Sequence, residues 1–223
     1  MDILVCAATT AEIRPFTAYL LKSGSAESKD VYALAEKKIR LLVTGVGAVA
    51  AAFSLARELA LRPYNLAIQA GIAGSFSPDL PIGTVVTVGR DIMADMGAEG
   101  PEGFLHLSEL DFAGNNRSME DHWIACDHRM QGLALPGPTV DAITVNTVSG
   151  SAETIRLRHQ KFKPAVETME GFSFHYACSR NGIPFVQIRS ISNQVEIRDK
   201  SKWNIPLAIE QLNRSLITLV EKL

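Results

Sequence analysis

The sequence has few of the residues that mark disulfide-rich or metal-binding proteins. Its 223 residues include three cysteines, Cys6, Cys126 and Cys178, and their wide spacing forms neither a CxxC pair nor a zinc-ligand pattern. The five histidines show no ligand spacing either, so no metal site is expected. Unpaired cysteines are typical of a reducing compartment, which favours a cytoplasmic protein.

Charge of one sign and long apolar runs are also missing. The chain has 22 Lys and Arg against 24 Asp and Glu, a formal net charge of −2, so it offers little to attract nucleic acid. No apolar run approaches the ~18 residues of a membrane-spanning helix, and no basic leader precedes the first apolar run. We therefore expect no membrane segment and no signal peptide.

Strand-like and helix-like patterns instead alternate along the whole chain, without a linker or an internal repeat. Strands are predicted at 2–8, 38–45, 65–75, 83–94, 141–150, 165–169 and 184–192. Helices are predicted from Thr9 onward, at 48–61, at 152–161, at 170–182 with Gly182 as its end, and after an N-cap at Asn204. The segment 95–138 is expected to form long loops with at most one helix. This pattern predicts one α/β domain over 1–223, with a mixed, mostly parallel central sheet between helices.

Two glycine-rich stretches follow predicted strands. "TGVGAVA" (44–50) fits the dinucleotide-binding pattern, but the next strand, "NLAIQAGI", lacks the terminal acid that binds the ribose. A nicotinamide cofactor is therefore not expected, and a turn with bare N–H groups beside a substrate is favoured over a simple tight turn. "AGIAGS" (70–75) is interpreted as a second turn, where Gly71 and Ala73 allow close approach of a ring or a sugar.

Three polar residues are predicted at strand ends. Glu12 lies in the first turn of the first helix, Glu170 at a strand-to-helix junction and Asn193 at the end of the last strand. Each has an ordinary structural interpretation, since a Glu in a first helical turn favours the helix dipole. Ligands of α/β proteins, however, bind at the carboxyl ends of the strands. The common location of Glu12, Glu170 and Asn193 at these strand ends therefore predicts an active site.

The motifs "TGVGAVAAA", "AGIAGS", "VSGSA", "TMEG" and "IRSISN" resemble, in order and spacing, those of the nucleoside phosphorylase/nucleosidase superfamily, most closely its methylthioadenosine/S-adenosylhomocysteine nucleosidase branch. The resemblance covers nearly the whole chain and is weakest over 95–138. It implies a single three-layer domain and cleavage of an N-glycosidic bond between a purine and a ribose. It also implies a small-molecule nucleoside substrate, no cofactor, and a homodimer or higher oligomer. We expect the subunits to meet at the segment 95–125.

The resemblance implies roles for individual residues. Glu12 matches the water-activating glutamate, and Glu170, with Met169 against the sugar, matches the glutamate that binds the ribose hydroxyls. Asn193 falls where the nucleosidases have an aspartate that protonates the purine. Arg189 and Ser192 match residues that support this position, and Trp203 matches an aromatic residue over the base pocket. Phe172 is a further candidate for a wall of that pocket. Ile72 replaces a serine of the nucleosidase pattern.

The change from aspartate to Asn193 is informative about the base. An amide offers an NH₂ donor and a C=O acceptor at fixed places, which suits a 6-oxopurine such as hypoxanthine. "ADMGAEG" (94–100) and "ISNQVEIRDKSKW" (191–203) resemble the branch of menaquinone biosynthesis whose nucleoside carries hypoxanthine and a benzoate. Candidate partners for that carboxylate are Arg156, Arg158, Arg198, Lys200 and Lys202.

Three alternatives remain open at this point. A methylthioadenosine nucleosidase would not explain Asn193. A purine nucleoside phosphorylase would explain it, but needs a phosphate site that the sequence does not indicate. A purine-binding sensor without turnover would not need both Glu12 and Glu170.

Overall fold

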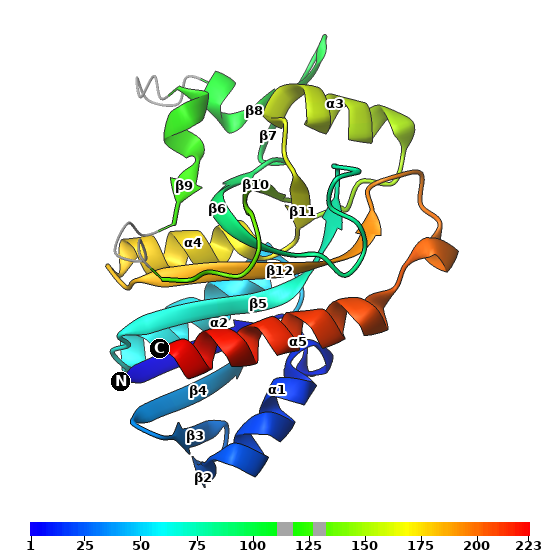
Figure 1. Cartoon of the computed structure of the whole chain (residues 1–223). Helices are drawn as coiled ribbons and strands as arrows, with labels where there is room; N and C mark the ends of the chain where they lie inside the picture. Colours follow the sequence, from blue (N-terminus) through cyan, green and yellow to red (C-terminus); the bar gives the residue numbers. More distant parts are fainter. Residues whose placement is uncertain (111–117, 127–132) are drawn as a thin grey trace.

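A computed structural model describes residues 1–110, 118–126 and 133–223 of the chain (Figure 1). A mixed ten-stranded sheet runs through the molecule, with the order β11-β10-β6-β12-β5-β1-β4-β3-β2 and β9 beside β6. The strands of the first half are β1 (Asp2–Ala7), β2 (Ser25–Ser28), β3 (Val31–Leu34), β4 (Lys37–Val43) and β5 (Leu66–Ser75). The others are β6 (Val85–Met93), β9 (Ile124–Ala125), β10 (Thr139–Thr144), β11 (Val166–Thr168) and β12 (Phe185–Gln194).

Helices cover both faces of the sheet (Figure 1). The five α-helices of the described residues are α1 (Thr10–Ser23), α2 (Ala48–Leu61), α3 (Ala152–Phe162), α4 (Gly171–Arg180) and α5 (Ile205–Lys222). One apolar core lies under α1 and α5, and a second lies under α2 and α4. Asn204 caps α5, and Leu212, Leu216 and Leu219 of this helix are buried. Ile205 at its start is 38% exposed, so the buried apolar face of α5 begins one turn later.

The sheet closes on itself at one side. β11 pairs with β10 in parallel and with β5 in antiparallel fashion, so that β5, β12, β6, β10 and β11 form a ring of five strands. β5 is ten residues long and pairs with β1 along its first half. It therefore runs from the open sheet into the ring, and the predicted site residues gather where it does so.

The α/β fold with a mixed sheet is confirmed, and β5 confirms the strand predicted at 65–75. The interpretation of 70–75 as a turn is wrong, because β5 continues through it to Ser75. The expectation of long loops over 95–138 is also wrong, because the described part of this segment contains a β-hairpin of β7 (Gly97–Gly100) and β8 (Gly103–His106), two short 3₁₀ helices and β9. The hairpin β2–β3 at the sheet edge was not predicted, because "SAES" is polar and fully exposed.

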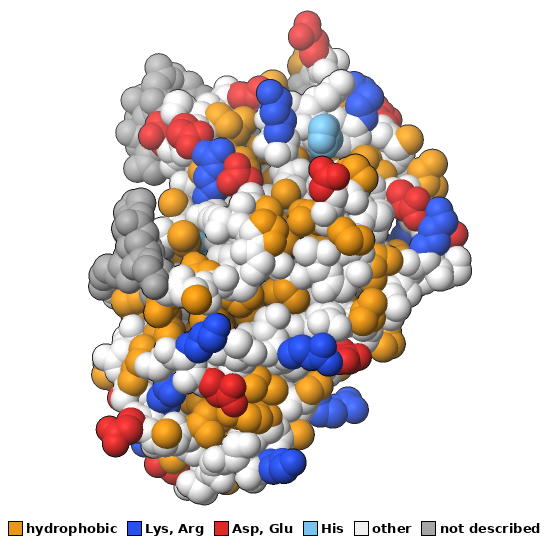
Figure 2. Space-filling view, in the orientation of Figure 1, with side chains coloured by type: hydrophobic (Ala, Val, Ile, Leu, Met, Phe, Trp, Pro, Cys, Tyr) orange, Lys and Arg blue, Asp and Glu red, His pale blue; other side chains and the backbone are white. Residues whose placement is uncertain are grey.

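Surface features agree with the composition. On the face shown in Figure 2, Lys and Arg side chains are interspersed with Asp and Glu, so the described part of this face offers no continuous basic area for nucleic acid. No described helix is both long and apolar enough to cross a membrane.

Candidate active site

Glu12 is held at the start of α1 by a capping box. Thr9 accepts a hydrogen bond from the Glu12 N–H, and the Thr9 N–H and hydroxyl both donate to Glu12 Oε2 at 2.9 Å. Oε1 accepts the N–H of Ile72 in β5 at 3.2 Å. A carboxylate oxygen can accept two hydrogen bonds, so Oε1 keeps one free lone pair. Glu12 thus completes the cap of α1, and its Oε1 still has one acceptor position available.

The backbone beneath Glu12 is completed by a residue from the other end of the chain. Buried Asn213 of α5 accepts the Phe16 N–H at 2.9 Å and donates to the Glu12 carbonyl at 2.8 Å. These are the two groups that an unbroken α-helix would pair with each other. Pro15 lies between them, and a proline inside a helix disturbs this pairing. Asn213 therefore fixes the Glu12 backbone to α5.

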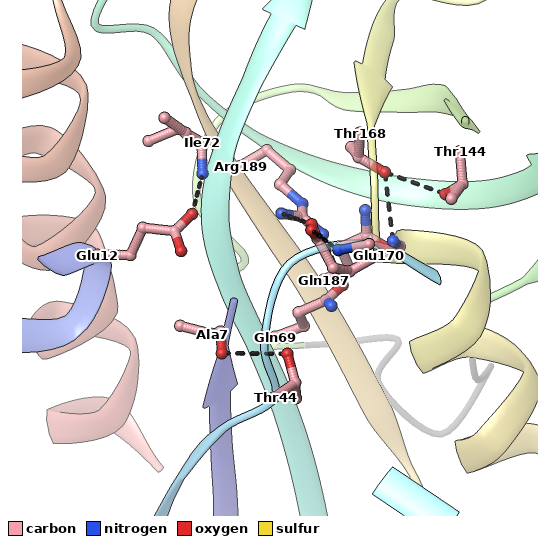
Figure 3. Close-up of polar contacts among 12 residues, drawn as sticks. Ala7, Glu12, Thr44, Gln69, Ile72, Thr144, Thr168, Glu170, Gln187 and Arg189 are labelled. Carbon is pink, nitrogen blue, oxygen red and sulfur yellow. Dashed lines mark hydrogen bonds and ion pairs between the residues drawn. The ribbon is translucent and has the colours of Figure 1, made fainter. Parts of the chain in front are cut away.

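Arg189 of β12 is the largest fully buried side chain. Its Nη2 donates to Gln69 Oε1 at 2.7 Å, and its Nη1 lies 3.9 Å from Glu170 Oε2. A Cβ on Gly71 would lie 2.1 Å from this Nη1 and 3.2 Å from Glu12 Oε1. A glycine is therefore required at position 71, because any side chain there would collide with the arginine. Figure 3 shows Glu12, Arg189 and Glu170 with their partners.

Glu170 lies at the junction of β11 and α4, in the N-cap position of that helix, but its side chain does not cap it. Its Oε1 instead accepts the Gly47 N–H at 2.8 Å, from the turn before α2. Burial raises the pKa of Glu170, and the neighbouring Arg189 acts against that rise. The turn at 44–50 thus presents a bare N–H group, that of Gly47, and this group orients Glu170.

Asn193 lies farther along the same strands. β12 has a bulge between Ile191 and Asn193, which places Asn193 opposite Gly74, three residues beyond the Arg189–Gly71 pair. Its Oδ1 accepts the Ser192 hydroxyl at 2.8 Å, and its Nδ2 donates to the Gln194 carbonyl at 2.9 Å. One amide hydrogen and one lone pair remain free. Arg189 Nη1 thus lies near Glu170 and near the Gly71 backbone that Glu12 also approaches, whereas the amide of Asn193 bonds Ser192 and Gln194.

The other predicted site residues surround these two positions. Met169 and Phe172 flank Glu170 and are half-buried, and the Phe172 ring stacks on Tyr176. Trp203 follows the short helix 200–202, and its ring lies 5.3 Å from the Arg198 guanidinium. The next residue, Asn204, donates its N–H to the Ser192 carbonyl at 2.9 Å. Buried Ala73 accepts the Ser192 hydroxyl on its carbonyl.

Sequence reasoning missed Gln69, Gly47 and Asn213, which orient Arg189, Glu170 and Glu12. Gln69 and Asn213 had one local signal, a polar residue at a position where a strand or helix pattern requires an apolar one. Their partners are 120 and 201 residues away along the chain, so the sequence does not indicate what they bind. Among the described residues, no three His, Cys, Asp or Glu side chains lie close enough to hold a metal ion.

Comparison with known proteins shows that the chain belongs to the phosphorylase superfamily, whose family model matches residues 3–221. Within it, the chain is 34% identical to the futalosine hydrolase of Streptomyces coelicolor, over 77% of this chain and 74% of that one. It is 30% identical to the futalosine hydrolase of Thermus thermophilus, over 80% of each chain.

Solved structures share the fold at low sequence identity. The native structure of futalosine hydrolase from Helicobacter pylori aligns with a TM-score of 0.82 at 18% identity, over 100% of this chain and 98% of that one. A 5'-methylthioadenosine/S-adenosylhomocysteine nucleosidase of the same organism gives the same TM-score and identity, over 100% and 99%. These likenesses establish the fold and do not discriminate between the two activities.

Proposed function

We propose that this chain hydrolyses the N-glycosidic bond of futalosine, releasing hypoxanthine and dehypoxanthine futalosine in menaquinone biosynthesis. The observation that carries the proposal is the arrangement along β5 and β12. Glu12 and Arg189 approach Gly71, Glu170 lies 3.9 Å from Arg189 Nη1, and Asn193 lies opposite Gly74. Three residues of strand span about 10 Å, which is comparable with the length of a nucleoside. The sugar would lie at the first position and the base at the second.

At the sugar position, Glu170 would bind the two ribose hydroxyls and stabilise the positive charge that develops on the ribose ring. The free lone pair of Glu12 Oε1 and the Arg189 Nη1 group both face Gly71. A water there could accept from the arginine and donate to the glutamate, which would take its proton as it attacks the anomeric carbon. General-base catalysis of this kind contributes roughly 10²- to 10⁴-fold.

At the base position, Asn193 would select a 6-oxopurine. Ser192 and Gln194 fix the amide, so its free N–H and its free lone pair are held in place. The N–H suits the 6-oxo group or the imidazole nitrogen, and the lone pair suits the ring N–H of hypoxanthine. An amide cannot donate a full proton, so Asn193 would stabilise the leaving base by hydrogen bonds. Mismatched hydrogen bonding in such a pocket can reject a substrate by up to ~10⁴-fold.

The benzoate of futalosine would be bound by Arg198. Two of the other candidate cations have acidic partners within the chain: Arg158 binds Glu167 and Lys202 binds Glu196, each at 3.0 Å. Arg198 makes no ion pair among the described residues and lies against the Trp203 ring. Its N–H bonds the Gly150 carbonyl at 3.2 Å, which places it between the segment after β10 and the segment after Asn193.

We also propose that the protein is a cytoplasmic homodimer or higher homo-oligomer. None of its three cysteines, all within the described residues, forms a disulfide, as in reducing compartments. The outer side of α2 exposes Val49 by 81% and Phe53 by 69%, and Val46 before it by 59%. Exposed apolar side chains gathered in this way are typical of a subunit interface. The segment 95–125, where the sequence predicts the interface, also exposes apolar side chains at Met96, Phe104 and Leu105.

The test is chromatography of the released base in phosphate-free buffer, with futalosine, inosine and methylthioadenosine in parallel. Hypoxanthine from futalosine alone is the expected result. Adenine from methylthioadenosine would support the alternative nucleosidase, a rate that depends on added phosphate would support a phosphorylase, and tight hypoxanthine binding without turnover would support a sensor.

A further inference from the structure

The first turn of α4 is capped by two threonines from neighbouring strands. The Phe172 N–H donates to Thr144 Oγ1 at 2.7 Å, and the Gly171 N–H donates to Thr168 Oγ1 at 3.2 Å. Both threonines are almost completely buried, in β10 and β11. Helix N–H groups at this position are usually satisfied by the N-cap side chain. Because the threonines satisfy them, the side chain of Glu170 is free to reach Gly47 and Arg189.

Asp91 of β6 lies behind these threonines and is fully buried. The Thr144 hydroxyl donates to Asp91 Oδ1 at 2.8 Å and lies 3.0 Å from the Thr168 hydroxyl. An ionised carboxylate only accepts hydrogen bonds, so it fixes the direction of the Thr144 proton. The lone pairs of Thr144 are then left for the Phe172 N–H and the Thr168 hydroxyl, and Thr168 in turn accepts from Gly171.

The contact between Asp91 and the helix start is tight. A Cβ on Gly171 would lie 2.2 Å from Asp91 Oδ2, so the carboxylate packs directly against the backbone that follows Glu170. The other neighbours of this carboxylate are Gln187, whose Nε2 is 3.4 Å away, the backbone N–H of Ile92 and the more distant Arg189. Complete burial raises the pKa of Asp91 to about 7. A buried charge with so few partners reduces stability, so packing alone does not explain it.

We propose that Asp91 is a positioning residue for the reaction, acting through Thr144 and Thr168 on the first turn of α4 to present Glu170 to the sugar. The proposal rests on the proposed function, in which Glu170 binds the ribose. Asp91 itself touches neither Glu170 nor the site of the substrate. Its effect is therefore expected on catalysis at the sugar and not on binding of the free base.

The sharpest variant is Asp91→Asn, which keeps the shape and removes the charge. We expect its unfolding temperature at pH 8 to rise, because a buried charge is lost, while kcat/KM for futalosine falls about tenfold. A residue with a merely structural role would not gain stability and lose activity together. Thr144→Val should lower kcat/KM by roughly 10²-fold, since misplacement of about 1 Å costs that much. Thr144→Ser should restore most of the activity.

A pH profile tests the charge directly. Below about pH 7 Asp91 becomes protonated and can donate to Thr144, so the direction of the hydrogen-bond chain is no longer fixed and kcat/KM should fall. In Asp91→Asn, the fall of kcat/KM that protonation of Asp91 causes on the acid side of the profile should disappear. The fall that protonation of the glutamates causes should remain. The titratable groups facing the network from other elements are Arg189 of β12 and His175 of α4. Burial lowers the pKa of His175 to about 4, so it stays neutral in this range.

Thr87→Val is the matched control. Thr87 is a buried threonine of the same strand as Asp91, and its hydroxyl binds the Pro136 carbonyl outside the site. It should lose stability as Thr144→Val does, with kcat/KM unchanged. Hypoxanthine should bind all variants as it binds the wild type. Wild-type kcat/KM in Thr144→Val, or equal losses in Thr87→Val and Thr144→Val, would overturn the proposal.

A measurement that needs no substrate separates this proposal from the proposed function. Hydrogen exchange at the Gly171 and Phe172 amides, followed by NMR, should be at least tenfold faster in Thr144→Val than in wild type and unchanged in Thr87→Val. If the wild type cleaves no nucleoside, the proposed function fails, and the exchange rates still report whether the network holds the helix start. Unchanged exchange in Thr144→Val would overturn the positioning proposal even in an active enzyme.

Discussion

At the scale of single residues, the site depends on side chains that can make more hydrogen bonds than their structural partners use. Glu12 closes a capping box and still has one free lone pair on Oε1. Asn193 binds Ser192 and Gln194 and still has one free hydrogen and one free lone pair. The structural contacts orient these groups, and the free positions are available to a substrate.

Glu12→Gln should abolish turnover, because an amide cannot accept a proton from water. We expect kcat to fall by at least ~10²-fold while calorimetric binding of hypoxanthine stays within about twofold, since the base site is not altered. Glu58→Gln is the matched control, because Glu58 has the same 6% exposure and binds Arg40 and Arg62 instead. Full activity in Glu12→Gln would remove Glu12 from the role of base.

Asn193→Asp should move the preference from hypoxanthine nucleosides toward adenine nucleosides. An aspartic acid can donate to the imidazole nitrogen of adenine and accept from its exocyclic amine. The ratio of kcat/KM for futalosine to that for methylthioadenosine, measured by released base, should fall by at least ~10-fold, because hydrogen-bond mismatches dominate such discrimination. An unchanged ratio would show that Asn193 does not read the base.

At the scale of elements, each of the two glutamates lies at the start of a helix that another part of the chain completes. Threonines of β10 and β11 cap α4, and Asn213 of α5 binds the Phe16 N–H and the Glu12 carbonyl of α1. The bulge in β12 likewise sets the position of Asn193 opposite Gly74, as bulges near active sites often do. Single polar contacts between these elements therefore set the positions of the site residues.

Asn213→Leu should destabilise the protein although it fits the apolar pattern of α5. The Phe16 N–H and the Glu12 carbonyl would lose their partner inside the core, and each unsatisfied buried group costs roughly 1–3 kcal/mol. We expect a fall of about 2–5 kcal/mol in the free energy of unfolding, measured with urea. Thr218→Ala, on the exposed side of the same helix, should change it by less than ~0.5 kcal/mol.

At the scale of the whole molecule, the closed ring and the open sheet share β5, and the site lies where one passes into the other. The start of α2 lies beside this place, since Gly47 binds Glu170. The exposed apolar side of α2 thus connects the site with the proposed subunit interface. Assembly and activity are therefore expected to depend on each other.

Phe53→Glu should yield a monomer if α2 forms the interface between subunits. A charge in place of a 69% exposed aromatic should cost little in an isolated subunit and much in a desolvated interface. The measurement is molar mass by light scattering across a dilution series, with Arg214→Glu on the exposed side of α5 as the charge control. A monomeric wild type would contradict the proposed assembly.

The sequence alone determined the types of most elements, their order, and the polar residues at the strand ends. These follow from local periodicity and capping, which a few neighbouring residues specify: α2 begins and ends where its pattern predicts. Only the tertiary structure decided that β5 runs through 70–75 without a turn, that β11 closes a ring with β5, and that Gln69 and Asn213 bind Arg189 and the Glu12 backbone. Each of these depends on a partner far away in the chain, such as the Arg189 and Glu12 groups that approach Gly71. A local pattern cannot specify such a partner, because it depends on how the distant segments pack together.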